Sequence, residues 1–296
     1  MRIMLIGARG QLAQEFVRET EQRGNHEIVA LAHEQLDIRD SQRVDALVAQ
    51  ARPECIVNTA AFHQVDRCEE ERELAFAVNQ GGVRNVARAA ERAKALLVQF
   101  STDYVFDGSK TTPYLETDEA KPLSVYGRSR LAGEKAVAEE CSRYLLIRTC
   151  GLYGRAGSAS KAGNFVETML RLAGQKKPLR VVNDQVCTPT STRHLAQHLL
   201  PLVAAAAAGK AQGLFHMTSS GECSWYQFAQ EVFRLAGVQA ALSPCSSEEY
   251  NTKAQRPRYS VLENRALKTA GFTALQPWQE ALAQYMSARA DQPALR

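Results

Sequence analysis

One segment of the chain places a phenol and a fixed cation where both can act on the same bound group. Tyr126 and Arg130 stand four residues apart in the run VYGRSRLAGE, residues 125–134, so on a helix their side chains share one face. A nearby cation favours the phenolate form of a tyrosine, whose pKa is ordinarily about 10. Such a tyrosine can give its proton to an oxygen that is gaining negative charge. The spacing therefore predicts a general acid, although a helix start with a packed tyrosine and a solvated arginine would show the same pattern.

A glycine-containing loop near the start of the chain is typical of nucleotide-binding proteins. Gly7 and Gly10 stand in the run GARGQLA, residues 7–13, which follows the first apolar run and opens the first helical pattern. Gly7 permits a tight turn, Gly10 lets the backbone approach a pyrophosphate, and Ala13 allows close packing of helix on sheet. We expect a dinucleotide to bind here, with a turn that merely needs glycine as the alternative.

The residues after the second apolar run indicate which dinucleotide binds. This run ends near residues 32–34, and no acid stands cleanly at its tip to hold a ribose 2′-hydroxyl. Arg9, in the glycine loop, can meet a 2′-phosphate, which favours NADPH over NADH. Asp37 and Ile38 can flank an adenine ring, although the start of a helix explains Asp37 equally well.

Polar segments follow three further apolar runs. They are residues 58–63 (NTAAFH), 101–108 (STDYVFDG) and 148–154 (RTCGLYG). Ligands of a doubly wound sheet bind at the carboxyl ends of its strands. We therefore expect these segments to form one crevice with the glycine loop and Tyr126, although each alone can be an ordinary polar loop.

The elements that must position these residues alternate in type. Amphipathic helical patterns separate short apolar runs through the first half, which predicts right-handed βαβ units and an α/β fold with a Rossmann-type doubly wound parallel sheet. The predicted strands are residues 3–6, 28–32, 55–59, 96–100 and 144–148, and the predicted helices are 11–22, 41–51, 66–79, 82–93 and 124–140.

The second half is less regular and predicts a smaller C-terminal α/β substrate lobe. We place the dinucleotide-binding Rossmann domain at residues 1–150. Residues 151–296 are expected to form mainly the substrate-binding lobe, with some segments returning to the Rossmann domain. Further strands are predicted at residues 180–182 and 214–217, and further helices at 195–208 and 225–236.

Composition excludes several classes of partner. The chain is 45% hydrophobic and 23% charged with a net charge of +4, and it has no lysine-rich run, so we expect no nucleic-acid partner. The first apolar run is far too short for a signal peptide or a membrane span. The seven cysteines are odd in number and contain no C-x-x-C pair, which indicates reduced thiols in a cytoplasmic protein.

Five segments, in matching order along nearly the whole chain, resemble dTDP-4-dehydrorhamnose reductases of the extended short-chain dehydrogenase/reductase superfamily. They are GARGQLA, STDYVFDG, VYGRSRLAGE, DQVCTPT at residues 184–190 and RPRYSVL at residues 256–262. The resemblance implies a Rossmann domain and a lobe that holds a nucleotide-linked keto sugar. It implies NAD(P)H-dependent reduction of a 4-keto-6-deoxy sugar, dTDP-4-dehydro-L-rhamnose to dTDP-L-rhamnose, with NADPH expected and NADH possible.

The resemblance also implies roles for individual residues. Thr102 matches the hydroxyl partner of the substrate carbonyl, Tyr126 the general acid, and Arg130 the lysine that binds the nicotinamide ribose and lowers the pKa of the tyrosine; these three are the expected catalytic residues. The expected cofactor-binding residues are Gly7, Arg9, Gly10, Gln11, Leu12, Asp37, Ile38, Ala60, Ala61, Asn79, Tyr126 and Arg130. The expected substrate-binding residues are His63, Thr102, Asp103, Tyr104, Tyr126, Asn164 and Arg256.

Three positions depart from the pattern of the family. Arg130 keeps the charge of the usual lysine but is bulkier, planar and always protonated, which implies either a retuned enzyme or a protein that binds cofactor without efficient turnover. Gly151 stands where these reductases commonly place a tryptophan against the sugar, so we expect an enlarged pocket. Glu15 fits one carboxylate of the Mg²⁺ site that some members form at a dimer contact, but Arg193 stands where another would be, and we predict no metal site.

Two other functions stay open on the sequence. One is a cofactor-binding regulatory protein, because regulatory subunits of methionine adenosyltransferase resemble this branch of the superfamily. The departures at Arg130 and Gly151 motivate it. The other is UDP-sugar epimerase chemistry, which uses related residues and would show tightly retained NAD⁺ without net cofactor consumption. The sequence does not decide between a monomer and a homodimer.

Overall fold

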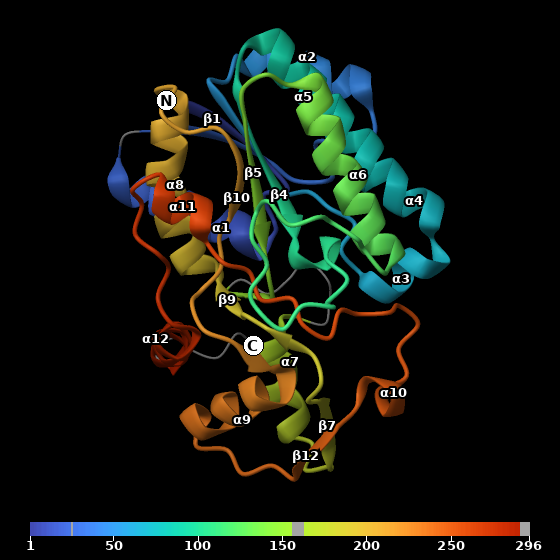
Figure 1. Cartoon of the computed structure of the whole chain (residues 1–296). Coiled ribbons are helices and arrows are strands. Elements are labelled where there is room, and N and C mark those ends of the chain that lie inside the picture. Colours follow the sequence, from blue (N-terminus) through green and yellow to red (C-terminus); the bar gives the residue numbers. More distant parts are fainter. Residues whose placement is uncertain (25, 156–162, 291–296) are drawn as a thin grey trace.

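A six-stranded parallel sheet forms the centre of the protein (Figure 1). The computed structural model describes residues 1–24, 26–155 and 163–290. The strands are β1 (Arg2–Ile6), β2 (Glu27–Leu31), β3 (Cys55–Asn58), β4 (Leu96–Thr102), β5 (Tyr144–Thr149) and β10 (Gly213–His216). They lie in the order β2, β1, β3, β4, β5, β10, and each neighbouring pair is parallel. The predicted Rossmann-type sheet is confirmed, with β2 and β3 on opposite sides of β1.

Helices bury both faces of this sheet. Successive side chains of a strand point to opposite faces, so Ile3 and Leu5 belong to one core and Met4 and Ile6 to the other. Burial on both faces explains why the strands read as continuous apolar runs. The first face is covered by α1 (Gln11–Arg23), α8 (Thr192–Ala207) and α11 (Arg265–Thr269), and the second by α2 (Ser41–Ala51), α5 (Val83–Ala93) and α6 (Val125–Glu140).

The connection from β3 to α5 differs from the prediction. The single helix expected over residues 66–79 is wrong, because the backbone at Glu71 leaves the helical region, with φ −112° and ψ 52°. The segment instead forms α3 (Val65–Glu70), α4 (Arg72–Phe76) and a π-helix, η1 (Ala77–Gly82), which runs directly into α5. Such π turns are frequent at functional sites, and this one carries Asn79.

A smaller lobe lies below the sheet in Figure 1, built around α7, α9, β7 and β12. Its aromatic core contains Tyr153, Phe228 and Trp278. Its short strands pair as β6 (Leu152–Tyr153) with β9 (Thr190–Ser191), β7 (Leu179–Val182) with β12 (Leu242–Cys245), and β8 (Val186–Cys187) with β11 (Cys223–Ser224). Its helices are α7 (Phe165–Ala173), α9 (Trp225–Ala236), α10 (Ser247–Tyr250) and α12 (Trp278–Ala290).

The elements predicted in the second half are present, but not all of them lie in the lobe. The predicted helix over residues 225–236 matches α9, and the predicted strand at 180–182 lies in β7. The predicted strand at 214–217 is β10, which joins the edge of the central sheet beside β5. The predicted helix at 195–208 lies in α8, which packs on the same sheet. No helix in the described ranges is long and apolar enough to cross a membrane.

Candidate active site

The glycine loop forms a cradle at the carboxyl end of β1. Gly7 has φ +85°, and a Cβ at this position would lie 2.6 Å from Thr59 Oγ1, so the turn requires glycine. The N–H groups of Gly7 and Ala8 both donate to the carbonyl of Leu31, at 2.9 and 3.1 Å. Gly10 then begins α1 without a side-chain cap, and the first turn of that helix contains no acid. The exposed N–H groups of this turn are therefore suited to an anion.

A cavity of about 990 Å³ extends from this cradle to Tyr126. Its volume falls at the upper end of the range for small-molecule and cofactor sites. The predicted cofactor-binding residues line it, with the exception of Asn79. Asn79 lies behind the wall, where its side chain accepts from the N–H of Phe62 at 2.9 Å and donates to Ser129 Oγ at 2.9 Å. It thus joins a cavity-lining segment to α6 and shapes the cavity from outside.

The wall of this cavity also offers polar atoms that the protein itself does not use. In the described part of the chain, Gln11 Oε1 and Thr149 Oγ1 are buried without a hydrogen-bond partner, and both residues line the cavity. Gln11 is fixed in place because its Nε2 donates to the carbonyl of Leu152 at 3.0 Å. The cradle, the volume and these polar atoms together fit a dinucleotide.

At the end of the cavity near β2, the structure corrects the expectation that no acid stands at the tip of this strand. Glu34 lines the cavity just beyond β2 and forms an ion pair with Arg9, at 2.5 Å between Oε1 and Nη1. An acid is therefore present where none was expected. Asp37 and Ile38 line the same end, and hydrogen bonds from Arg39 hold the pKa of Asp37 below its usual value.

Tyr126 and Arg130 lie in the first turns of α6, which two glycines bring close to its neighbours. Ser124 caps the helix by accepting from the N–H of Gly127 at 3.1 Å. A Cβ at Gly127 would overlap the carbonyl oxygen of Tyr104, and a Cβ at Gly133 would overlap that of Asn79. Glycine at both positions lets α6 lie directly against the end of β4 and against η1.

A buried ion pair ties the same helix to the sheet. Glu134 on α6 accepts from Arg148 on β5 at 2.7 and 2.9 Å, and from Ser101 Oγ on β4 at 2.5 Å. Both charged side chains are buried, so loss of either partner would leave an unpaired buried charge. This contact fixes the distance from Tyr126 to the ends of β4 and β5.

The phenol of Tyr126 and the guanidinium of Arg130 are in contact, as their spacing predicted. Arg130 Cζ lies 5.8 Å from the centroid of the Tyr126 ring, and Arg130 Nη2 donates to the carbonyl of Phe100 at 2.5 Å. Burial raises the pKa of Tyr126, while Arg130 and a hydrogen bond with Thr102 lower it. Burial has the larger effect, so the pKa of the phenol lies above its usual value. Arg130 therefore lowers the pKa of Tyr126, as expected, but by less than burial raises it.

Thr102 and Asp103 stand beside the phenol at the end of β4, where η2 (Asp103–Val105) begins. Thr102 Oγ1 donates to Asp103 Oδ1 at 3.0 Å and accepts from the N–H of Tyr104 at 3.2 Å. Asp103 also accepts from Ser260 Oγ at 2.6 Å and from Cys150 Sγ at 3.1 Å. Burial raises the pKa of Asp103, and these hydrogen bonds oppose the rise.

A second cavity of about 170 Å³ adjoins the first at these residues. It lies against the ring of Tyr104, which packs edge-on against Tyr126 with the ring centroids 5.8 Å apart. The phenol of Tyr126 and the hydroxyl of Thr102 therefore lie where the larger cavity meets the smaller one. The residues common to both cavities are Thr102, Asp103, Tyr126, Cys150 and Gly151.

Three predicted substrate residues lie outside the smaller cavity. His63 lines the larger cavity, and burial lowers the pKa of its ring. Asn164 lines neither cavity, and its amide accepts from the N–H of Glu167 at 3.1 Å and donates to the carbonyl of Gly154 at 2.8 Å. Arg256 pairs with Asp66 at 2.8 Å and lines a neighbouring hollow of about 600 Å³, which also contains Gln185.

Trp225 is the functional candidate that the sequence analysis missed. It begins α9 and lines the smaller cavity, with its ring 4.7 Å from that of Phe165. Gly151 has φ +53°, and a Cβ there would lie 3.1 Å from Trp225 Cη2 and 3.2 Å from Pro189 Cα. The expectation of an open pocket at Gly151 is therefore wrong, since Trp225 occupies that space from another part of the chain.

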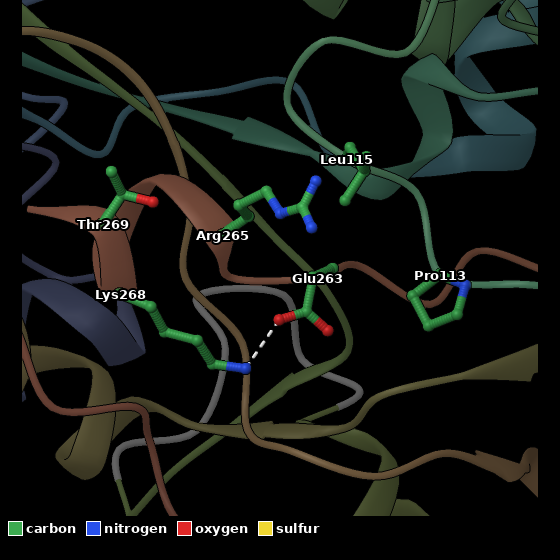
Figure 2. Close-up of a pocket in the computed structure, with 6 residues that line it drawn as sticks. All are labelled: Pro113, Leu115, Glu263, Arg265, Lys268 and Thr269. Carbon is green, nitrogen blue, oxygen red and sulfur yellow. Dashed lines mark hydrogen bonds and ion pairs between the residues drawn. The ribbon is translucent and has the colours of Figure 1, made fainter.

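One further hollow lies apart from the Tyr126 site. Figure 2 shows one of about 450 Å³ lined by Pro113, Leu115, Glu263, Arg265, Lys268 and Thr269, in which Lys268 pairs with Glu263 at 2.6 Å. It shares no lining residue with the two cavities above. Among the residues that the structure describes, no three or more His, Cys, Asp or Glu side chains form a group that could hold a metal ion, and Glu15 is paired with Arg18 at 3.0 Å.

Comparison with known proteins places this geometry in a family. The family model described as the RmlD substrate binding domain matches residues 1–290. The chain belongs to this family. Its relatives include the dTDP-4-dehydrorhamnose reductase of Streptomyces griseus, 42% identical over 284 residues, which cover 95% of this chain and 91% of that protein. The spore coat polysaccharide biosynthesis protein SpsK of Bacillus subtilis (strain 168) is 39% identical over 97% of this chain and 98% of that protein.

Solved structures of the family superpose on the whole chain. The dTDP-4-dehydrorhamnose reductase of Bacillus anthracis str. Ames, in complex with NADP, has a TM-score of 0.92 at 35% identity and covers 97% of this chain and 99% of its own. The likeness thus includes both the Rossmann sheet and the smaller lobe.

Proposed function

We propose that this family member reduces a dTDP-linked 4-keto-6-deoxy sugar with NADPH, or with NADH, and that its reaction is dTDP-4-dehydro-L-rhamnose to dTDP-L-rhamnose. The observation that carries the proposal is the position of Tyr126 and Thr102 at the junction of two cavities. One cavity has the cradle and the volume for a dinucleotide, and the other is a separate pocket for the group to be reduced. The names of the relatives supply the class of sugar.

In this proposal the larger cavity binds the dinucleotide. The N–H groups at the start of α1 would bind its phosphates, with Gly7 and Gly10 leaving room for them. Arg130 is placed for the nicotinamide ribose, since it lines the inner end of the cavity beside Tyr126. When bound, the nicotinamide group supplies a hydride to the carbonyl carbon of the sugar.

The chain itself moves the proton. Tyr126 donates its phenolic proton to the carbonyl oxygen as that oxygen gains charge. Thr102 donates a hydrogen bond to the same oxygen after turning away from Asp103, its partner at 3.0 Å in the free protein. Arg130 stabilises the phenolate that is left, because its guanidinium lies over the ring and pairs with no carboxylate in the part of the chain that is described.

The smaller cavity is assigned to the sugar. Trp225 provides an apolar wall, and Asp103, Tyr104 and Ser260 provide polar groups around it. The nucleotide portion extends into the neighbouring hollow, which shares Gln185 with this cavity. That hollow also contains three cations suited to a diphosphate, Lys253, Arg256 and Arg258.

The proposal includes the organisation and the setting of the protein. Residues 1–150 form the dinucleotide-binding domain and residues 151–296 mainly bind substrate, with α8 and β10 returning to the sheet. The protein works as a monomer or homodimer without nucleic acid or membrane. Seven cysteines without a C-x-x-C pair fit the reducing cytoplasm.

A panel of nucleotide-linked keto sugars tests the proposal. The purified protein is mixed with NADPH or NADH and each of several dTDP- and UDP-linked 4-keto-6-deoxy sugars, and the absorbance of the reduced nicotinamide is followed. We expect consumption of the cofactor with the dTDP-linked compounds, and a product that comigrates with dTDP-L-rhamnose. Binding of the dinucleotide with no consumption on any sugar would instead support a regulatory role.

A further inference from the structure

The adenosine end of the larger cavity contains an arginine and an acid that face each other. The N–H groups of Gly7 and Ala8 donate to the carbonyl of Leu31, so the glycine loop is fastened to the end of β2. The chain then turns, with the N–H of Gln35 donating to the carbonyl of Ala32 at 3.0 Å. This turn places Glu34 beside Arg9, 2.5 Å apart, and both side chains line the cavity.

Of the two arginines at this end, Arg9 is the freer to change partners. Arg39 is held by Asp37 through two nitrogens, at 3.0 Å from Nε to Oδ1 and 2.5 Å from Nη2 to Oδ2. Arg9 touches Glu34 through one nitrogen only, and its side chain is 70% exposed. Exposed single-contact ion pairs contribute little to stability, so a stronger anion can draw Arg9 away from Glu34.

The two nicotinamide dinucleotides offer this pair opposite chemistry. NADPH carries a phosphate on the 2′ position of its adenine ribose, which an arginine binds through two hydrogen bonds and a neighbouring carboxylate repels. NADH carries a hydroxyl at that position, which donates a hydrogen bond to a carboxylate. Glu34 therefore favours NADH and opposes NADPH, while Arg9 favours NADPH.

We infer that Arg9 and Glu34 form an exchange pair, in which Arg9 changes partner from Glu34 to a 2′-phosphate, and that Glu34 thereby determines how strongly NADPH is preferred. This inference rests on the proposed function, because it assumes that the cavity binds a nicotinamide dinucleotide. In the presence of NADPH, Arg9 leaves Glu34 for the 2′-phosphate. In the presence of NADH, Glu34 keeps Arg9 and accepts from the 2′-hydroxyl.

The test measures dissociation constants for NADP⁺ and NAD⁺ by calorimetry, without any sugar present. For Glu34→Gln we expect the preference for NADP⁺ over NAD⁺ to rise about tenfold, because repulsion of the phosphate and the acceptor for the hydroxyl are both weakened. For Arg9→Gln we expect NADP⁺ to bind about tenfold more weakly and NAD⁺ to change less than about threefold.

A matched control separates this effect from a general change of charge. Glu27 is exposed, begins β2 and pairs with Arg2 at 3.2 Å, so Glu27→Gln removes the same charge from the opposite end of the strand. We expect its NADP⁺ preference to stay within about twofold of the wild type, because exposed charges far from the phosphate are screened. A Glu34→Gln preference that is equally unchanged, or a Glu27→Gln preference that rises as much, would overturn the inference.

These dissociation constants and the panel of keto sugars together distinguish this inference from the proposed reaction. If the Glu34→Gln preference shifts as expected and no keto sugar is reduced, the exchange pair stands and the proposed reaction falls. If keto sugars are reduced and the preference does not shift, the reaction stands and the exchange pair falls. Failure of the wild type to bind either dinucleotide would overturn both.

Discussion

The guanidinium carbon of Arg130 lies 5.8 Å from the centroid of the Tyr126 ring, one helical turn further along α6. Its Nη2 donates to the carbonyl of Phe100, which holds the planar group in place. Arg130 lowers the pKa of the phenol while burial raises it. These contacts support our proposal that Arg130 takes the role that the family resemblance gives to a lysine, with a fixed rather than a mobile cation.

Replacement of Arg130 by methionine tests this role. The change removes the charge that lowers the pKa of Tyr126, so burial alone acts and the pKa rises further. Because the proposed role of Tyr126 requires its protonated form, the alkaline decline of kcat should move to higher pH. Loss of the stabilised phenolate should also lower kcat at neutral pH by about 100-fold. The measurement is kcat for the keto sugar between pH 6 and pH 11.

The control for this variant is Arg130→Lys, which keeps the charge. We expect its kcat to stay within about tenfold of the wild type and its alkaline decline to stay in place, since an ammonium also favours the phenolate. An unshifted alkaline decline in the methionine variant would show that Arg130 does not act on the phenol. A lysine variant far faster than the wild type would show that arginine attenuates the enzyme.

Trp225 should control the binding of the sugar and leave the dinucleotide unaffected. Trp225→Ala removes the wall opposite Gly151 and should raise KM for the keto sugar by about tenfold or more, because a buried aromatic contact is lost. The dissociation constant for NADPH should stay within about twofold, since Trp225 does not line the larger cavity.

Trp278 provides the matched control. It is buried in the core of the smaller lobe, and its Nε1 donates to the carbonyl of Glu222 at 3.3 Å. Trp278→Phe should lower the melting temperature without a selective rise in KM for the sugar. A KM for Trp225→Ala equal to that of the wild type would remove Trp225 from the substrate site.

His216 should make the fold sensitive to acid. It is fully buried at the end of β10, and burial together with the charge of Arg148 lowers its pKa to about 3. In the unfolded chain the ring takes up a proton near pH 6.5, whereas in the folded chain it stays neutral. Stability from this group is therefore present above pH 6.5 and is lost as the pH falls toward 3.

The size of this effect can be measured by urea unfolding at two pH values. Between pH 7.5 and pH 5 the proton uptake by His216 should cost the wild type about 2 kcal/mol of unfolding free energy. His216→Gln is less stable at both pH values, but its loss between them should be smaller by about that amount. Equal losses of unfolding free energy in the two proteins would mean that the pKa of His216 is not lowered in the folded state.

Local patterns in the sequence were sufficient to predict the Rossmann scaffold and the contact between Tyr126 and Arg130. The five apolar runs of the first half are strands of the central sheet, and four of them are buried, because a parallel sheet covered on both faces needs continuous apolar segments; β2, at the edge, is partly exposed. The contact between Tyr126 and Arg130 follows from their spacing on one helix. Gly7 and Gly10 form the expected cradle because their backbone requirements are set within a few residues.

Contacts between distant segments could not be predicted in the same way. Trp225 reaches Gly151 only through the packing of the smaller lobe, and Glu34 meets Arg9 only because the glycine loop is fastened to β2. Asn164 is different, since Glu167 three residues later is a recognisable signal of a helix start. That local signal predicts the position of Asn164 as the cap of α7.

The central claim is that Tyr126 supplies the proton, and single turnover of Tyr126→Phe tests it most directly. The enzyme with bound NADPH is mixed with dTDP-4-dehydro-L-rhamnose, and nicotinamide absorbance is followed in the wild type and the variant. We predict that the variant binds NADPH within about twofold of the wild type, because the ring is kept, and reacts about 100- to 10,000-fold more slowly. A variant that reacts as fast as the wild type would contradict the account.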